Sequence, residues 1–329
     1  MNPRRTWLGS RRRRIAPFAF ALSVACAPCW AQSSPPPSPE FSVYTAPGCA
    51  GRKLVPAFED FSGRKVVRVV DALNQQSWDK LRSSIPWAAA CWKDAGFKLT
   101  LSVPLLTNAG PGTLADGAAG KYDDIFIVLG RTLVENNLSD AVLRIGWEFN
   151  GEWMPWRADR DPESYKAYFR RVVTLMRGVP GQHFEFEWTT GHGRHAIDPT
   201  LAYPGDDYVD VVGMDVYDQI WNEGMSDPAA RWAYYLNGAF GLAWQVDFAR
   251  THGKRFAYGE WGIGVMPDGH GSGDDPYFVT KMAEWFSSSG AYYQSYWDAT
   301  DPIYDAKISG GRFPLSAKAF RDAFAEKKP

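Results

Sequence analysis

Short apolar, β-branched runs alternate with longer amphipathic stretches from residue 41 onward. The short runs have the length of buried strands and the longer stretches that of helices, which is typical of repeated βα units around a parallel sheet. Eight parallel strands close a barrel, so the pattern predicts a single (β/α)8 TIM-barrel domain, α/β in class, over residues 41–329. The eight runs cover residues 41–45, 65–73, 98–106, 141–149, 183–190, 208–217, 254–261 and 291–297.

The clearest predicted helix covers residues 162–177. Asp161 can cap its first turn, Pro162 suits its first position, and apolar residues recur at helical spacing along it. The same periodicity predicts further helices at 77–95, 122–136, 229–252, 277–289 and 316–326.

The N-terminal segment has a different composition. In residues 1–31 six arginines flank or precede an apolar stretch without acidic residues, which predicts an export signal cleaved near Ala31. Its apolar stretch is too short to span a bilayer. Residues 32–40 are rich in serine and proline and are predicted to form a linker. We therefore expect a secreted or periplasmic protein, with twin-arginine export and a lipid anchor at Cys26 as alternatives.

Removing residues 1–31 changes the charge balance. It removes six of the 36 Lys and Arg and none of the 37 Asp and Glu, which leaves a formal net charge of −7. This balance disfavours nucleic acid or an anionic membrane surface as a partner. Cys49 and Cys91 are the two cysteines that remain. In an oxidising compartment we expect them to form a disulfide, with two separate buried thiols as the alternative.

Two glutamates stand at the carboxyl ends of predicted strands, where barrels of this class carry their chemistry. Glu148 ends the fourth run and Glu260 the seventh. Cleavage of a glycosidic bond needs a proton for the departing oxygen and an anion facing the sugar, and two carboxyl groups supply both. Either glutamate alone could serve as a structural ion-pair partner, but the pair at these positions predicts a glycoside hydrolase.

Three segments carry a family resemblance. Residues 143–156 (LRIGWEFNGEWMPW) resemble the acid/base motif of glycoside hydrolase family 26, a clan A family that includes endo-β-mannanases. Residues 203–217 resemble its sixth-strand segment and residues 253–262 its nucleophile strand. The resemblance implies that Glu148 is the acid/base, Glu260 the nucleophile, and Tyr217 the hydroxyl that orients the nucleophile.

One residue departs from the family pattern. Mannanases of this family usually place histidine immediately before the acid/base, and this chain has Trp147 there. Tryptophan brings a large ring with a single donor. The substrate implied by the resemblance is a β-mannan, with a bacterial exopolysaccharide as its competitor. An alternative places the Trp147 ring outward, against the helices.

Several other side chains near the strand ends are candidates for substrate contact. Arg144 could also hold a neighbouring carboxylate ionised. The chain has fifteen tryptophans, and aromatic faces stack on sugar rings, so we expect at least two of them to form sugar platforms, Trp153 and Trp156 first. Packing is the alternative for each ring, and a loop cap for His192. The candidates are Arg144, Trp147, Asn150, Trp153, Trp156, Trp188, His192, Asp215, Trp261 and Trp297.

The sequence thus predicts an exported, retaining endo-glycoside hydrolase of a β-linked polysaccharide, acting by double displacement. No His, Cys and carboxylate cluster has metal-ligand spacing, so we expect no metal and no cofactor. The expected partner is a poly- or oligosaccharide, and we expect a monomer without a membrane span. A catalytically silent glycan-binding barrel and a transglycosylase that uses the same two glutamates remain alternatives.

Overall fold

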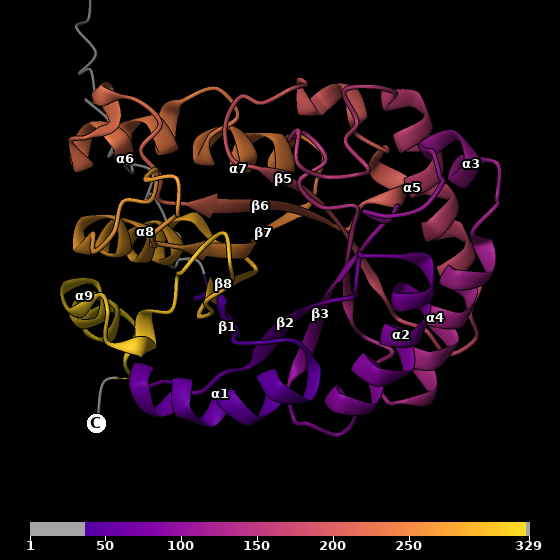
Figure 1. Cartoon of the computed structure of the whole chain (residues 1–329), viewed down its shortest axis with the longest axis horizontal. Helices are drawn as coiled ribbons and strands as arrows, with labels where there is room; N and C mark the ends of the chain where they lie inside the picture. The colour runs from indigo at the N-terminus through magenta and orange to yellow at the C-terminus, as the bar shows by residue number, and fades with distance from the viewer. Residues whose placement is uncertain (1–36, 327–329) are drawn as a thin grey trace, which may run out of the picture. The chain divides into compact units, whose positions relative to one another are not determined.

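The structure, a computed structural model, describes residues 37–326 and consists of a closed parallel barrel wrapped by helices (Figure 1). The strands pair in chain order and the eighth closes on the first. They are β1 (Glu40–Tyr44), β2 (Arg68–Ala72), β3 (Lys98–Val103), β4 (Val142–Ile145), β5 (Glu185–Gly191), β6 (Val211–Tyr217), β7 (Arg255–Gly262) and β8 (Tyr293–Trp297). The predicted (β/α)8 barrel is confirmed. The predicted export signal and most of the predicted linker lie outside the described residues.

The helices follow the strands around the barrel. They are α1 (Gly48–Ser62), α2 (Trp78–Trp92), α3 (Leu114–Ala118), α4 (Asp123–Glu135), α5 (Pro162–Arg177), α6 (Pro228–Asn237), α7 (Leu242–Thr251), α8 (Pro276–Ser289) and α9 (Pro314–Phe324), with short 3-10 turns at 199–202, 206–208, 223–225 and 308–310. The bounds of α5 are those predicted, and Asp161 caps it by accepting from the Ser164 amide. Helices α1 and α3 were not predicted. Among the described residues, none of the helices has the length and apolarity needed to cross a membrane.

The single helix predicted over 229–252 is wrong, because the chain turns between α6 and α7. Helix α6 ends where Gly238 is extended, with a ψ of 166°, and Phe240 then takes a left-handed φ of 56°. A Cβ on Gly238 would lie 2.5 Å from the Tyr234 carbonyl oxygen, so the turn closes only around glycine. Apolar periodicity runs through this break and conceals it.

The fourth predicted strand is too long, since β4 ends at Ile145 rather than at Phe149. Gly146 and Glu148 both have a φ of 53°. A Cβ on Gly146 would lie 2.6 Å from a methyl carbon of Leu105, which explains glycine at this point. Arg144 and Glu148 are therefore not successive inward positions of one strand. Glu148 lies in a turn whose left-handed backbone is unfavourable for glutamate, and its amide donates to the Thr189 carbonyl at 2.9 Å.

The main hydrophobic core fills the space between strands and helices, whereas the inside of the barrel contains a polar layer. Buried charged and hydroxyl side chains from β2 to β7 make up this layer, among them Arg68, Thr100, Ser102, Arg144, Glu187 and Asp215. Outside the barrel, a disulfide between Cys49 and Cys91 joins α1 to α2, with Cα atoms 4.7 Å apart. The polar layer lies below the strand ends that carry the two candidate glutamates.

Candidate active site

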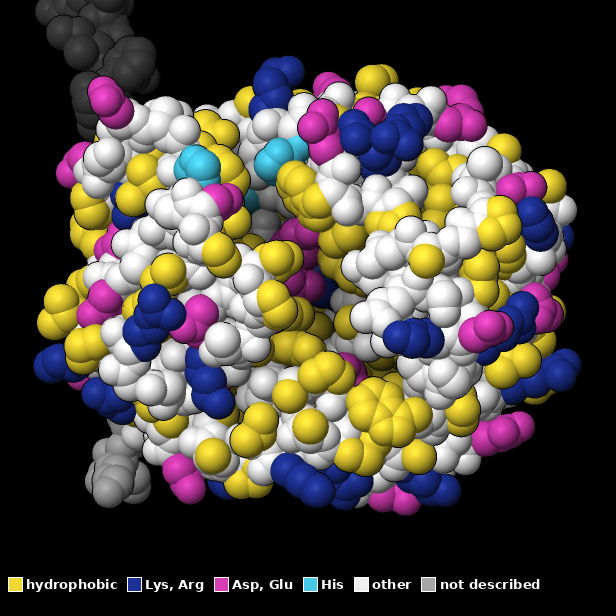
Figure 2. All heavy atoms as spheres, viewed as in Figure 1, with side chains coloured by type: hydrophobic (Ala, Val, Ile, Leu, Met, Phe, Trp, Pro, Cys, Tyr) yellow, Lys and Arg dark blue, Asp and Glu magenta, His cyan; other side chains and the backbone are white. Residues whose placement is uncertain are grey.

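Glu148 and Glu260 lie at the same end of the barrel. Glu148 follows β4, and Glu260 lies near the carboxyl end of β7, opposite Asp215 of β6. Figure 2 shows acidic side chains recessed in a hollow on the face that it presents. The register of β7 against β6 shifts between Ala257 and Glu260, as at a β-bulge, and bulges beside active sites re-aim side chains.

Two donors hold the Glu260 carboxylate. The Arg144 guanidinium donates to Oε1 at 2.8 Å, and the Tyr217 hydroxyl donates to Oε2 at 2.8 Å. Burial and the nearby Glu260 charge raise the pKa of Tyr217, so its hydroxyl keeps the proton that it donates. A Cβ on Gly259 would lie 2.5 Å from Arg144 Nε, so glycine before Glu260 gives the guanidinium room to reach it. These contacts fix the orientation of the Glu260 carboxylate and place a cation beside it.

Arg144 also faces two further carboxyl groups inside the barrel. It pairs with Asp215 of β6, and its Nε lies 3.4 Å from Glu187 of β5. It donates to the Ser102 hydroxyl at 2.9 Å. Burial raises the pKa of both Glu187 and Asp215. One guanidinium therefore serves three buried acids, and burial favours the neutral form of Glu187 and of Asp215.

Glu148 has a different environment. Burial first, and the Glu260 charge second, raise the pKa of Glu148 to about 7. Its Oε2 accepts a hydrogen bond from the Trp153 indole nitrogen at 2.6 Å, which works against this increase. At neutral pH a substantial fraction of Glu148 therefore carries a proton. A carboxyl group that can hold a proton beside a carboxylate paired with a cation is the arrangement that glycosidic cleavage requires.

Three of the tryptophan candidates border open space at this end. Trp153 is 53% exposed, and its ring packs edge-on against His195 at 4.9 Å between centroids. Trp297 is half-buried at the end of β8 and stacks on Tyr44 at 3.7 Å. Trp147 lines a separate pocket beside β2. The first two are placed to act as sugar platforms.

Trp156, Trp188 and Trp261 are wrongly predicted as substrate contacts, because all three are fully buried. The Trp156 indole donates to the Trp147 carbonyl oxygen at 2.7 Å. Trp188 follows the inward-facing Glu187, and Trp261 follows Glu260. Successive strand residues face opposite sides, so both rings pack between the sheet and the helices.

Two polar candidates are also corrected. Arg144 is completely buried and contacts acids, so it positions Glu260 rather than touching substrate. Asn150 is equally buried, and its side-chain amide makes two 2.8 Å hydrogen bonds with the Gly191 backbone. The hydrogen bonds of both side chains go to other groups of the protein.

Two further candidates lie at the carboxyl ends of neighbouring strands. His192 Nε2 lies 2.9 Å from the Tyr235 carbonyl oxygen, and burial lowers the pKa of His192 to about 4, which keeps the ring neutral. This contact matches the alternative of a loop cap. Asp215 has one oxygen on Arg144, while Oδ1 is buried without a hydrogen-bond partner among the described residues.

The sequence interpretation missed Glu187 and Ser102. Glu187 accepts hydrogen bonds from Thr189 and from Tyr293 of β8, so it ties the acid layer across the barrel. A Cβ on Gly213 would lie 2.2 Å from Glu187 Oε1, which shows how closely β6 approaches it. The available signal for Glu187 was the alternation of glutamate with aromatic residues over 184–188 (FEFEW). Within residues 37–326, no three His, Cys, Asp or Glu side chains gather in a way that could hold a metal ion.

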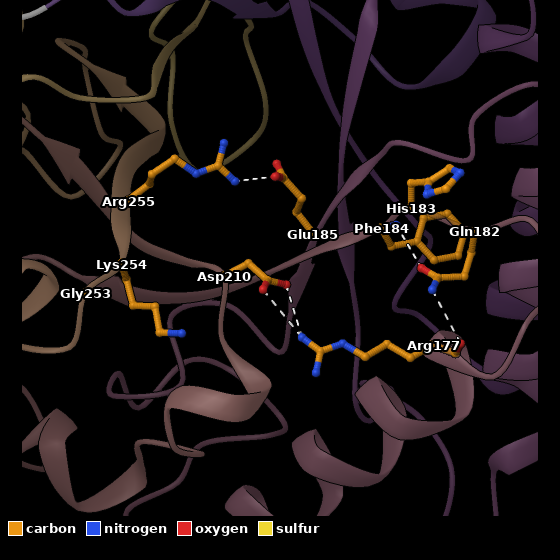
Figure 3. A pocket seen from close by; sticks show the side chains of 9 residues that line it. All are labelled: Arg177, Gln182, His183, Phe184, Glu185, Asp210, Gly253, Lys254 and Arg255. Carbon is orange, nitrogen blue, oxygen red and sulfur yellow. Dashed lines mark hydrogen bonds and ion pairs between the residues drawn. The ribbon is translucent and has the colours of Figure 1, made fainter.

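A hollow of about 610 Å³ lies at the opposite end of the barrel, before the amino ends of β5 to β7 (Figure 3). Its charged side chains form ion pairs, Arg255 with Glu185 and Arg177 with Asp210. Lys254 donates to the Asp206 carbonyl oxygen at 2.6 Å. Four of its five charged side chains are therefore in ion pairs, and its lining holds no excess of acidic groups.

Comparison with known proteins finds similarity to one family of glycoside hydrolases. Residues 125–250 match the model of glycosyl hydrolase family 26. A mannan endo-1,4-beta-mannosidase from Bifidobacterium adolescentis is 26% identical over 198 residues, which is 53% of this chain and 19% of that protein. The chain thus spans about a fifth of the length of this curated relative.

Two solved structures have the same fold. An endo-beta-1,4-mannanase double mutant from Cellulomonas fimi has a TM-score of 0.66 and 20% identity, over 88% of this chain and 71% of that one. The catalytic domain of a family 26 endo-beta-1,4-mannanase from a Bacillus species has a TM-score of 0.60 and 18% identity, over 88% and 87%. The resemblance to glycoside hydrolase family 26 is confirmed, and the matched residues include two of the three segments that carry it, 143–156 and 203–217.

Proposed function

We propose that this chain is a retaining endo-glycoside hydrolase that cleaves a β-linked polysaccharide, with β-mannan as the first substrate to test. The observation that carries the proposal is the contrast between the two glutamates. Glu260 accepts from Arg144 and Tyr217, whereas the pKa of Glu148 is raised to about 7. The named activities of the relatives, mannan endo-1,4-beta-mannosidase and endo-beta-1,4-mannanase, point to the substrate class.

The reaction proceeds in two displacements. A Glu260 oxygen attacks the anomeric carbon while Glu148 gives its proton to the departing glycosidic oxygen, so the glycosidic bond breaks and a glycosyl ester forms on Glu260. Glu148, now ionised, takes a proton from water, and the resulting nucleophile displaces Glu260. Two inversions retain the configuration at the anomeric carbon. Arg144 and Tyr217 stabilise Glu260 whenever it is the free carboxylate.

Export to an oxidising compartment is part of the proposal. The disulfide between Cys49 and Cys91 supports it, because such bonds persist mainly in secreted and periplasmic proteins. Cleavage near Ala31 would release the barrel as a secreted or periplasmic monomer. Determining the N-terminal residue of the protein recovered from culture medium or periplasm tests this part.

Replacement of the nucleophile tests the mechanism. We expect Glu260→Ala to lower kcat on soluble β-mannan by at least about a thousandfold. Azide or formate should restore part of the turnover and give the inverted product, because a small anion then occupies the space of the missing carboxylate. Unimpaired turnover in this variant would sink the assignment.

Product analysis separates the alternatives. Reducing ends released from a polysaccharide panel, with product sizes read by mass, support an endo-hydrolase. Transfer to an added acceptor sugar in place of water would identify a transglycosylase. Binding in a calorimeter without released reducing ends would identify a silent glycan-binding barrel.

A further inference from the structure

A second hollow, of about 490 Å³, lies at the carboxyl end of β2, at the same barrel end as the two glutamates. Its walls include Leu73, Asn74 and Gln75, which follow β2, together with Trp87 of α2 and Trp147. Its volume is within the range of pockets that enclose small molecules. Trp147 directly precedes Glu148, so the hollow begins one residue from the proposed acid.

Two indole rings border this hollow. Trp147 is only 7% exposed and packs against Trp156 at 4.7 Å between centroids. Trp87 is 45% exposed and lies inside α2, directly after Pro86. A tryptophan that keeps nearly half its surface in water loses the stabilisation of burying that apolar area. The exposed ring therefore indicates a surface for an apolar face of a ligand.

Neighbouring groups of the protein hold the Trp87 side of the hollow in place without a ligand. Cys91, one helical turn beyond Trp87, is bonded to Cys49 at the start of α1. Gly48 lies so close to the Trp87 ring that a Cβ there would approach it within 2.3 Å. The Gly48 amide donates to the buried Asp71 carboxylate at 2.9 Å. Such preorganisation reduces the entropy that binding would otherwise cost.

The polar groups of the hollow suit hydroxyls rather than ions. Gln75 Oε1 is buried and has no hydrogen-bond partner within residues 37–326, so it needs a donor. Sugar hydroxyls are donors. Lys80 is the one charged residue among the lining side chains, and its ammonium is bonded to Gln76 Oε1. The other polar side chains of the lining, Asn74, Gln75, Ser83 and Ser84, are neutral and can bond hydroxyl groups.

We propose that this hollow is a distal subsite that binds a neutral hexose unit of the substrate chain, with Trp87 and Trp147 as its aromatic walls and Gln75 as an acceptor. The inference rests on the proposed function and assigns to this chain a specificity element of its own. Trp147 stands where the family usually has histidine, and here its ring shapes the distal subsite instead of bonding sugar beside the acid.

The test compares a long and a short substrate. For β-1,4-mannohexaose and β-1,4-mannotriose, kcat/KM is measured for the unaltered protein, Trp87→Ala and Trp87→Phe. We expect Trp87→Ala to lower the ratio of hexaose to triose kcat/KM about tenfold, because only the longer chain reaches the ring. Trp87→Phe keeps an aromatic face and should retain most of the ratio. Leu54→Ala, at a 38% exposed position of α1, is the control and should leave the ratio unchanged.

The outcomes separate the subsite from the chemistry. A ratio unchanged in Trp87→Ala, in a protein that cleaves both substrates, overturns the subsite and leaves the proposed function intact. If the unaltered protein cleaves neither, calorimetric titration with mannohexaose decides. Affinity that falls about tenfold in Trp87→Ala supports the subsite while the hydrolase assignment fails, and affinity that is absent or insensitive to Trp87 overturns the subsite.

Discussion

The two ends of the barrel treat charge in opposite ways. At the amino end, the hollow of Figure 3 has exposed ions that pair one to one, such as Arg255 with Glu185. At the carboxyl end, the buried Arg144 is shared by Glu187, Asp215 and Glu260. Opposite charges that pair one to one keep each other ionised, whereas an excess of buried acids favours the protonated form of some of them. Uneven charge, rather than the size of a hollow, therefore distinguishes the site that can do acid–base chemistry.

Removing the shared cation should have the largest effect. We expect Arg144→Met to lower the free energy of unfolding by roughly 3–5 kcal/mol at neutral pH, because three buried acids lose their counter-ion. Denaturant unfolding measures this change. Since acids can neutralise themselves by taking up protons, the loss should shrink as the pH falls. A loss that is independent of pH would contradict the charge-sharing explanation.

The pH profile tests the acid at this end. Glu148 must carry a proton to act, and its pKa is about 7, so kcat/KM should fall as the pH rises through about 7. Its hydrogen bond from Trp153 favours the ionised form and lowers the pKa. Trp153→Phe removes that donor and should move the alkaline limb to higher pH.

Trp221→Phe is the matched control for this shift. Trp221 is also 53% exposed, but its indole nitrogen donates to Gln219 at 3.0 Å and contacts neither glutamate. The alkaline limb of kcat/KM for Trp221→Phe should coincide with that of the unaltered protein. An alkaline limb that moves equally in both variants would show that Trp153 does not act through Glu148.

The smallest effect is expected at the amino end. Arg255→Met breaks the ion pair with Glu185, whose two side chains are 45% and 29% exposed. Exposed pairs contribute up to about 1 kcal/mol, so the free energy of unfolding should fall by about that amount or less. Activity should be unchanged. A loss of activity comparable to that of Arg144→Met would show that the two ends are not independent.

The sequence by itself determined the barrel, because periodicity is a local property. Alternating apolar runs and amphipathic stretches gave eight strands and the bounds of α5. The same local signals placed Glu148 and Glu260 at strand ends, where a closed parallel barrel collects its polar groups. The three segments that resemble family 26 occur in the family's order, and they imply the roles of both glutamates and of Tyr217. In the structure the Tyr217 hydroxyl donates to Glu260.

Only the tertiary structure decided which side chains share space. The sequence does not distinguish Trp188 from Trp153, yet Trp188 is fully buried and Trp153 is 53% exposed. The left-handed backbone at Gly146 and Glu148 ends the alternation of inward and outward side chains along β4, so spacing in the sequence does not give the direction of Glu148. Glu187 joined the site because strands β4 to β8 bring it to Arg144 and Tyr293. Such contacts depend on residues far apart in the chain, so local patterns do not specify them.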